Sequence, residues 1–191
     1  MNGPAAGGRA LEDVGLTVVL GHGASGNASS MAPWVEGLVR RGIAARAIDL
    51  PRRRAEDAVP VFAAALEGGR ALPGGHSFGG RVASLAAARR IGEGMTVPGL
   101  VLLSYPLHRP GDPDSWAGRS AHWPALRCPV LLLSGEADPF ARVALLREAV
   151  RLLPSAELVT YPRVGHGLLP VLDAALDRIA AFVASVEGRW S

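Results

Sequence analysis

The sequence lacks lysine, and all 20 of its basic residues are arginines. Aromatic residues make up only 5% of the chain. A nucleic-acid-binding protein concentrates its basic charge and interleaves it with aromatic rings, whereas here the arginines are spread through predicted helices. Because the arginines are spread out, the formal net charge of +3 does not point to nucleic acid, and we predict no nucleic-acid partner.

The sequence also has little cysteine and no long apolar run. No stretch approaches the roughly 18 apolar residues of a membrane span, so we predict no membrane partner. Residues 1–15 lack the basic and then apolar pattern of a signal peptide. The one cysteine, Cys128, is expected to be a small buried apolar residue. These features favour a reducing, cytoplasmic location.

Ligand-binding signatures are missing as well. The sequence contains no cluster of metal ligands, no P-loop and no dinucleotide fingerprint, so we predict no metal and no cofactor. One basic cluster, Arg52–Arg54, is followed by Glu56 and Asp57, which favours a solvated loop away from the functional site. The alternative is a contact for an anionic group of a substrate.

The 191 residues suffice for one domain, 1–191, in which residues 1–13 form a disordered tail or an edge strand. Short apolar runs alternate with Ala-rich stretches of helical period, the pattern of an α/β fold. We predict a doubly wound, mostly parallel sheet of about six strands with helices on both faces. The expected strands cover 16–21, 44–50, 70–75, 99–104, 129–134 and 156–161, and the expected helices cover 33–41, 56–67, 79–90, 140–153 and 168–186.

Residues 105–128 are an exception to this pattern, and residues 105–123 carry Pro, Gly, His and Trp without clear periodicity. We predict a long loop there, near the carboxyl ends of the strands, where such folds bind ligands. Leu107, Trp116 and Trp123 of this segment are candidates to line an apolar substrate pocket, and packing in the core is an equal explanation.

The pentapeptide Gly75-His76-Ser77-Phe78-Gly79 matches the G-x-S-x-G nucleophile elbow, and it stands between a predicted strand and a predicted helix. This context predicts that Ser77 is a nucleophile. The alternative is a Gly-rich turn with a capping serine.

A serine hydroxyl needs a neighbouring base, and His166 follows the last predicted strand, where it can reach over the edge of the sheet. The two flanking glycines would also suit a surface turn. His108 and His122 precede the expected acid. His22 and His76 lie inside other motifs and are assigned to substrate binding.

The acid that orients the base should follow a strand between the serine and the histidine, and Asp138 fits. Because Pro139 follows it, Asp138 could instead cap a helix. Glu136 could belong to the wall of the site, and Asp112 and Asp114 are fallback acids. The order Ser, Asp, His is that of the α/β-hydrolases.

An oxyanion intermediate needs preorganised N–H donors. We expect one from Phe78, the residue after the nucleophile. The other should come from the loop after the first strand, from Ala24 or, as second choice, Gly23.

Several segments carry a family resemblance: GHGASGNASS at 21–30, GGHSFGGRVAS at 74–84, LVLLSYPLHRPG at 100–111, CPVLLLSGEADPF at 128–140 and VGHG at 164–167. With them the chain resembles the dienelactone-hydrolase-like branch of the α/β-hydrolase superfamily. Within that branch it is similar to the testis-expressed protein 30 type, whose domain also occurs in a subunit of the non-specific lethal chromatin complex. The resemblance implies a hydrolase scaffold with Ser77, Asp138 and His166 in the triad positions.

The chain departs from that branch in its nucleophile, because true dienelactone hydrolases use cysteine, and it has no room for a large cap domain. Together, the motifs predict a serine hydrolase that cleaves a small ester or thioester through an acyl-enzyme. The alternative is a non-catalytic interaction module that has kept the fold.

Overall fold

A computed structural model describes residues 15–67 and 70–190, so the predicted N-terminal tail or edge strand lies outside the described residues. Six strands form one sheet in the order β2-β1-β3-β4-β5-β6, and every neighbouring pair is parallel. The predicted fold class is confirmed. The strands are β1 (Thr17–Gly21), β2 (Ala45–Ile48), β3 (Ala71–His76), β4 (Leu100–Leu103), β5 (Val130–Gly135) and β6 (Ala156–Tyr161).

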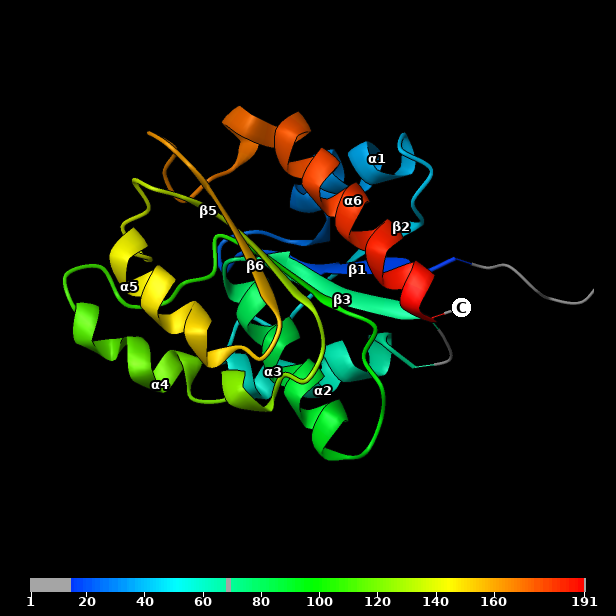
Figure 1. The fold of residues 1–191 in the computed structure, drawn as a ribbon, viewed down its shortest axis with the longest axis horizontal. Helices are drawn as coiled ribbons and strands as arrows, with labels where there is room; N and C mark the ends of the chain where they lie inside the picture. The colour runs from blue at the N-terminus through cyan, green and yellow to red at the C-terminus, as the bar shows by residue number, and fades with distance from the viewer. Residues whose placement is uncertain (1–14, 68–69, 191) are drawn as a thin grey trace, which may run out of the picture.

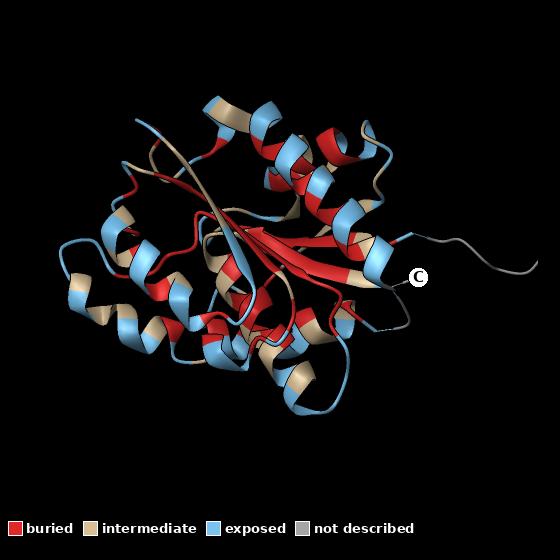
Figure 2. Cartoon of the chain, in the orientation of Figure 1, coloured by how far each residue is buried: buried red, intermediate tan, exposed pale blue. Residues whose placement is uncertain are grey.

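Helices cover both faces of this sheet (Figure 1). One face carries α1 (Ala32–Val39) and α6 (Leu172–Trp190), and the other carries α2 (Ala55–Ala65), α3 (Phe78–Gly92), α4 (Trp116–Ser120) and α5 (Val143–Ala149). Because helices shield both faces, every residue of β4 and β5 is buried, and the sheet lies between two apolar layers (Figure 2).

The predicted helix over 140–153 begins later than expected. Two hydrogen bonds hold residues 140–142 in a loop: the His108 N–H donates to the Phe140 carbonyl at 2.9 Å, and the Arg142 N–H donates to His108 Nε2 at 3.0 Å. Helix α5 therefore starts only at Val143. The sequence pattern gave no sign of this long-range tie.

The segment predicted as a long loop does lie near the carboxyl ends of the strands, but the prediction that it has no helical structure is wrong. This segment contains α4 and the 3-10 turns Pro113–Ser115 and Trp123–Ala125, elements too short for a helical period to show in the sequence. Tyr105 and Trp123 are buried beneath them, and the Tyr105 hydroxyl donates to the Arg119 carbonyl at 2.6 Å. Cys128 is 3% exposed in the same core, which confirms its predicted burial and raises the pKa of its thiol to about 12.

The backbones of β1, β3 and α3 approach one another closely at their glycines. A Cβ added to Gly79 would lie 2.2 Å from the carbonyl oxygen of Gly21, and one added to Gly75 would lie 2.6 Å from the Gly79 carbonyl carbon. No side chain fits between these backbones. The glycines that flank Ser77 therefore let α3 start directly against the sheet.

We predict that Gly79→Ala lowers the free energy of unfolding by at least about 1–3 kcal/mol, because its methyl group would collide with the backbone of Gly21. Thermal or urea unfolding followed by circular dichroism measures this. Gly92→Ala is the control: it ends the same helix, and no heavy atom lies within 4 Å of its added Cβ. A Gly79→Ala protein as stable as the Gly92→Ala protein would contradict the packing described.

Candidate active site

Ser77 stands at the sharp turn between β3 and α3. Its backbone has φ 51° and ψ −115°, a conformation that non-glycine residues seldom adopt. Its N–H donates to the Leu103 carbonyl at 2.8 Å, which ties the turn to β4. The turn lifts the hydroxyl above the carboxyl edge of the sheet.

His166 reaches Ser77 from the loop between β6 and α6. Its Nε2 lies 2.8 Å from Ser77 Oγ, and its Nδ1 lies 2.8 Å from Asp138 Oδ2. An ionised carboxylate only accepts, so the Nδ1–H donates to Asp138 and Nε2 is left to accept the serine proton. The geometry thus brings together the three residues singled out in the sequence, in hydrogen-bonded series.

Asp138 is held at its other oxygen too. Oδ1 accepts the Phe140 N–H at 2.8 Å, and the side chain is fully buried. Helix α5 is preceded by Arg142 at its N-cap position, so Asp138 does not cap that helix. Of the other acids, Glu136 accepts from Thr160 Oγ1 at 2.8 Å, and Asp112 and Asp114 are exposed beside α4.

The two histidines assigned to substrate binding brace the loops of the site. The His22 Nδ1–H donates to the Gly23 carbonyl at 2.8 Å and its Nε2 accepts the Leu50 N–H at 3.0 Å, with the ring 2% exposed. The His76 Nε2–H donates to the His166 carbonyl at 3.1 Å. Burial lowers the pKa of His76, which favours the neutral ring beside His166.

A second serine–histidine pair lies nearby. Ser84 Oγ is 2.8 Å from His122 Nε2, but Ser84 is fully buried and its hydroxyl donates to the Arg81 carbonyl at 2.8 Å. Burial and the Arg81 charge lower the pKa of His122 to about 4. In the described parts of the chain no carboxylate orients His122, so this pair lacks both access and an activated base.

The depressed pKa of His122 makes stability depend on pH. Its unfolded-state pKa is near 6.5, so between about pH 6.5 and pH 4 this residue is protonated in the unfolded chain and neutral in the folded protein. We predict that acidification from pH 6.5 to about 4 costs on the order of 2–3 kcal/mol through this residue.

Urea unfolding at both pH values tests this, with His122→Gln as the variant. Glutamine does not titrate, so the variant should lose less stability on acidification than the unchanged protein. Equal losses in the two proteins would contradict the shift.

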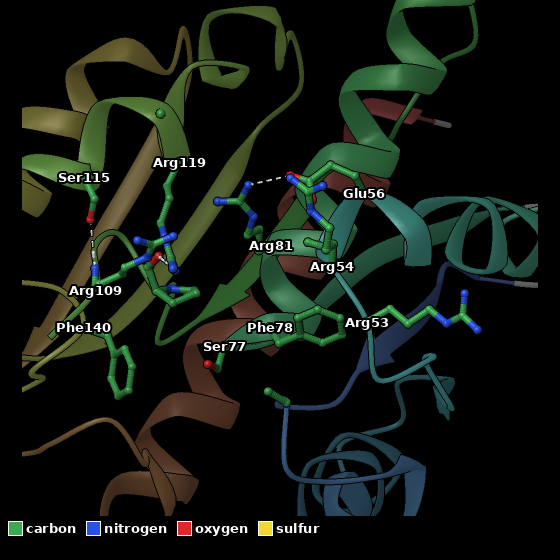
Figure 3. Close-up of a pocket in the computed structure, with 14 residues that line it drawn as sticks. Arg53, Arg54, Glu56, Ser77, Phe78, Arg81, Arg109, Ser115, Arg119 and Phe140 are labelled. Carbon is green, nitrogen blue, oxygen red and sulfur yellow. Dashed lines mark hydrogen bonds and ion pairs between the residues drawn. The ribbon is translucent and has the colours of Figure 1, made fainter. Parts of the chain in front are cut away.

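A pocket of about 600 Å³ opens over Ser77 (Figure 3). Phe78 and Ala24, the first-choice oxyanion residues, line it, and Gly23 lies outside its lining. Phe140 lines it too, with its ring 4.4 Å from that of His166 between centroids.

Leu107 and Trp116 do not line this pocket. Leu107 is fully buried, and Trp116 packs against the same core cluster, so both belong to the apolar core of the α3 face together with Trp123. Their apolar character in the sequence reflects that packing. Their placement gives no support to a role in substrate binding.

The basic cluster at 52–54 needs a correction. All three arginines are exposed, as predicted, but Arg53 and Arg54 line the pocket together with Ser77. The prediction that the cluster lies away from Ser77 is wrong, because β2 and α2 meet at the carboxyl edge of the sheet, where the pocket opens. The sequence analysis also missed Arg81, although it stands one helical turn after Ser77.

Comparison with known proteins identifies the family. Residues 53–182, more than half of the chain, match the family described as alpha/beta hydrolase domain, and the chain belongs to that family. None of the curated proteins matches the chain.

Solved structures agree with this fold at low identity. The monoacylglycerol lipase of Paleococcus ferrophilus has a TM-score of 0.77 at 17% identity, covering 89% of this chain and 94% of that one. One of the metagenome-derived lipolytic enzymes LipS and LipT has a TM-score of 0.74 at 17% identity, and the match covers 89% of this chain and 94% of that one. Est1E from Butyrivibrio proteoclasticus has a TM-score of 0.71 at 17% identity, and the match covers 90% of this chain and 88% of that one.

Over residues 15–67 and 70–190, no three His, Cys, Asp or Glu side chains gather as a metal site would require. No helix in those ranges combines the length and apolar character needed to cross a bilayer.

Proposed function

We propose that the protein is a serine hydrolase that cleaves a small ester or thioester through an acyl-enzyme. The observation that carries this proposal is the unbroken series from Ser77 Oγ to His166 to Asp138, with both hydrogen bonds at 2.8 Å, at the strained turn where the pocket opens. Family membership and the lipase and esterase folds support hydrolysis in general.

The proposed reaction has two halves. Ser77 Oγ attacks the carbonyl carbon of the substrate while His166 Nε2 takes the hydroxyl proton, and Asp138 stabilises the imidazolium that forms. The tetrahedral intermediate then collapses, the C–O or C–S bond breaks, and His166 gives its proton to the leaving alcohol or thiol. A water, deprotonated by His166, attacks the acyl-enzyme and releases the acid and Ser77.

The oxyanion requires two donors beside Ser77. Phe78 is the first residue of α3, so its N–H has no acceptor within the helix and is free to point at the pocket. Ala24 lines the same pocket from the loop after β1. We assign the oxyanion hole to the N–H groups of these two residues.

Within the family, we also propose the dienelactone-hydrolase-like branch and the testis-expressed protein 30 type, together with a cytoplasmic location. The segment Ser-Tyr-Pro-Leu-His at 104–108 supports the branch. Its Tyr105, Leu107 and His108 are all buried, and they hold the connection from β4 to α4 against the core.

A fluorophosphonate probe tests the serine without knowledge of the substrate, because it reacts only where a base activates the hydroxyl and donors hold the oxyanion. The unchanged protein should be labelled, and Ser77→Ala should abolish labelling. His166→Ala should nearly abolish it. Asp138→Asn should slow it by about 10⁴-fold, because the imidazole would adopt the wrong tautomer.

Ser84→Ala is the matched control, since Ser84 also lies beside a histidine but is fully buried. It should be labelled at the unchanged rate. Labelling that disappears with Ser84 and persists without Ser77 would move the nucleophile to the second pair. A folded, unchanged protein that is not labelled at all would overturn the hydrolase and leave the non-catalytic interaction module.

A further inference from the structure

The wall of the pocket over Ser77 is strongly cationic. Its charged lining residues are one acid, Glu56, and five arginines: Arg53, Arg54, Arg81, Arg109 and Arg119. The apolar lining residues are Ala24, Ala55, Phe78, Pro106 and Phe140. A long hydrocarbon chain bound here would dehydrate several of these guanidinium groups.

Three of the arginines come from separate elements and converge above the serine. Arg81 belongs to α3, Arg109 to the connection after β4 and Arg119 to α4. Figure 3 shows their side chains gathered on the same side of Ser77, whereas Arg53 extends away from it.

Specific contacts hold this cluster in place. Arg119 Nη1 donates to the Pro106 carbonyl at 2.9 Å, and the Arg119 carbonyl accepts the Tyr105 hydroxyl. The Arg109 N–H donates to Ser115 Oγ at 3.0 Å, which fixes the loop that carries its side chain. Buried partners thus position Arg119, whereas Arg109 is held through its backbone and its side chain is exposed.

Their charge is only partly compensated. Arg81 pairs with Glu56 at 2.8 Å, and its side chain is 19% exposed. Within the described residues, neither Arg109 nor Arg119 forms an ion pair with a carboxylate. Burial lowers the pKa of Arg119, and the charges of Arg81 and Arg109 lower it further, although the Asp112 charge opposes this effect.

Bringing three guanidinium groups together costs electrostatic free energy unless an anion lies among them. The planar guanidinium group suits a carboxylate or phosphate because it donates two parallel hydrogen bonds. We propose that Arg81, Arg109 and Arg119 form an anion-binding subsite that holds a carboxylate or phosphate group of the substrate while Ser77 attacks its carbonyl carbon. This inference rests on the proposed hydrolase and narrows its substrates to anionic esters or thioesters. The pocket volume of about 600 Å³ is within the range of small-molecule sites.

Protection against labelling tests the subsite without a known substrate. The rate of Ser77 labelling by a neutral fluorophosphonate is measured against increasing glutarate or butyl phosphate, with glutaramide and butanol as the uncharged counterparts. Both anions, or the one that the subsite prefers, should slow labelling in a saturable manner. The uncharged compounds should have little effect at the same concentrations.

Arg109→Gln is the informative variant, because Arg109 is exposed and its guanidinium makes no structural bond in the described residues. It should weaken protection by the anion about 10-fold, the loss of one charge-assisted contact. Arg151→Gln is the matched control, since it removes the same charge from an exposed residue at the opposite, amino end of the strands. It should leave protection unchanged.

Two substrate pairs show which part of the substrate carries the charge. Mono-4-nitrophenyl glutarate and 4-nitrophenyl valerate differ only in a terminal carboxylate on the acyl group. Butyryl coenzyme A and the butyryl thioester of N-acetylcysteamine differ in phosphates on the leaving group. The anionic member of at least one pair should have the higher kcat/KM, and Arg109→Gln should remove that preference.

These experiments give different results depending on whether the subsite proposal or the hydrolase proposal is wrong. Labelling without protection by either anion, or protection that Arg109→Gln leaves unchanged, overturns the subsite and keeps the hydrolase. Absence of labelling overturns the hydrolase. Calorimetric titration with glutarate and butyl phosphate then decides the subsite, because no binding, or equal binding by Arg109→Gln, overturns it as well.

Discussion

The contact on which the site depends is the side-chain-free crossing of β1, β3 and α3. With 2.2 Å between a Gly79 Cβ and the Gly21 carbonyl oxygen, only glycine lets α3 begin directly against the sheet. That approach forces the chain to turn within one residue, so Ser77 takes the strained φ of 51°. Packing of the two apolar layers offsets the free-energy cost of that strain. The hydroxyl then lies at the sheet edge instead of being buried.

The parallel sheet supplies the rest of the constellation, because all its strands end at one edge. Ser77 follows β3, Asp138 follows β5 and His166 follows β6, so three residues distant in sequence meet there. Hydrogen bonds between side chains and the backbone fix them: Asp138 accepts the Phe140 N–H, and His76 donates to the carbonyl of His166. The second pair, Ser84 and His122, shows that proximity alone does not suffice, since within the described residues no carboxylate orients His122, and Ser84 is fully buried.

The walls of the pocket over Ser77 carry five arginines and one acid. The structural neighbours include lipases, but likeness at 17% identity speaks for the fold alone. Here α4, which lies between β4 and β5, brings Arg119 to the pocket that Arg81 also lines. A fold therefore fixes where the nucleophile stands, whereas the connections decide the charge and shape that a substrate meets.

The sequence by itself determined the parallel α/β fold and the residues around Ser77, Asp138 and His166. Apolar runs indicate strands buried on both faces, and G-x-S-x-G between a strand and a helix indicates a sharp local turn. Both patterns involve only residues close together in the sequence. Only the tertiary structure decided that Leu107 and Trp116 belong to the core, that residues 105–128 contain α4, and that Arg53 and Arg54 border the pocket. Those facts depend on contacts between distant segments, such as the hydrogen bond from Tyr105 to Arg119, and no local pattern encodes them.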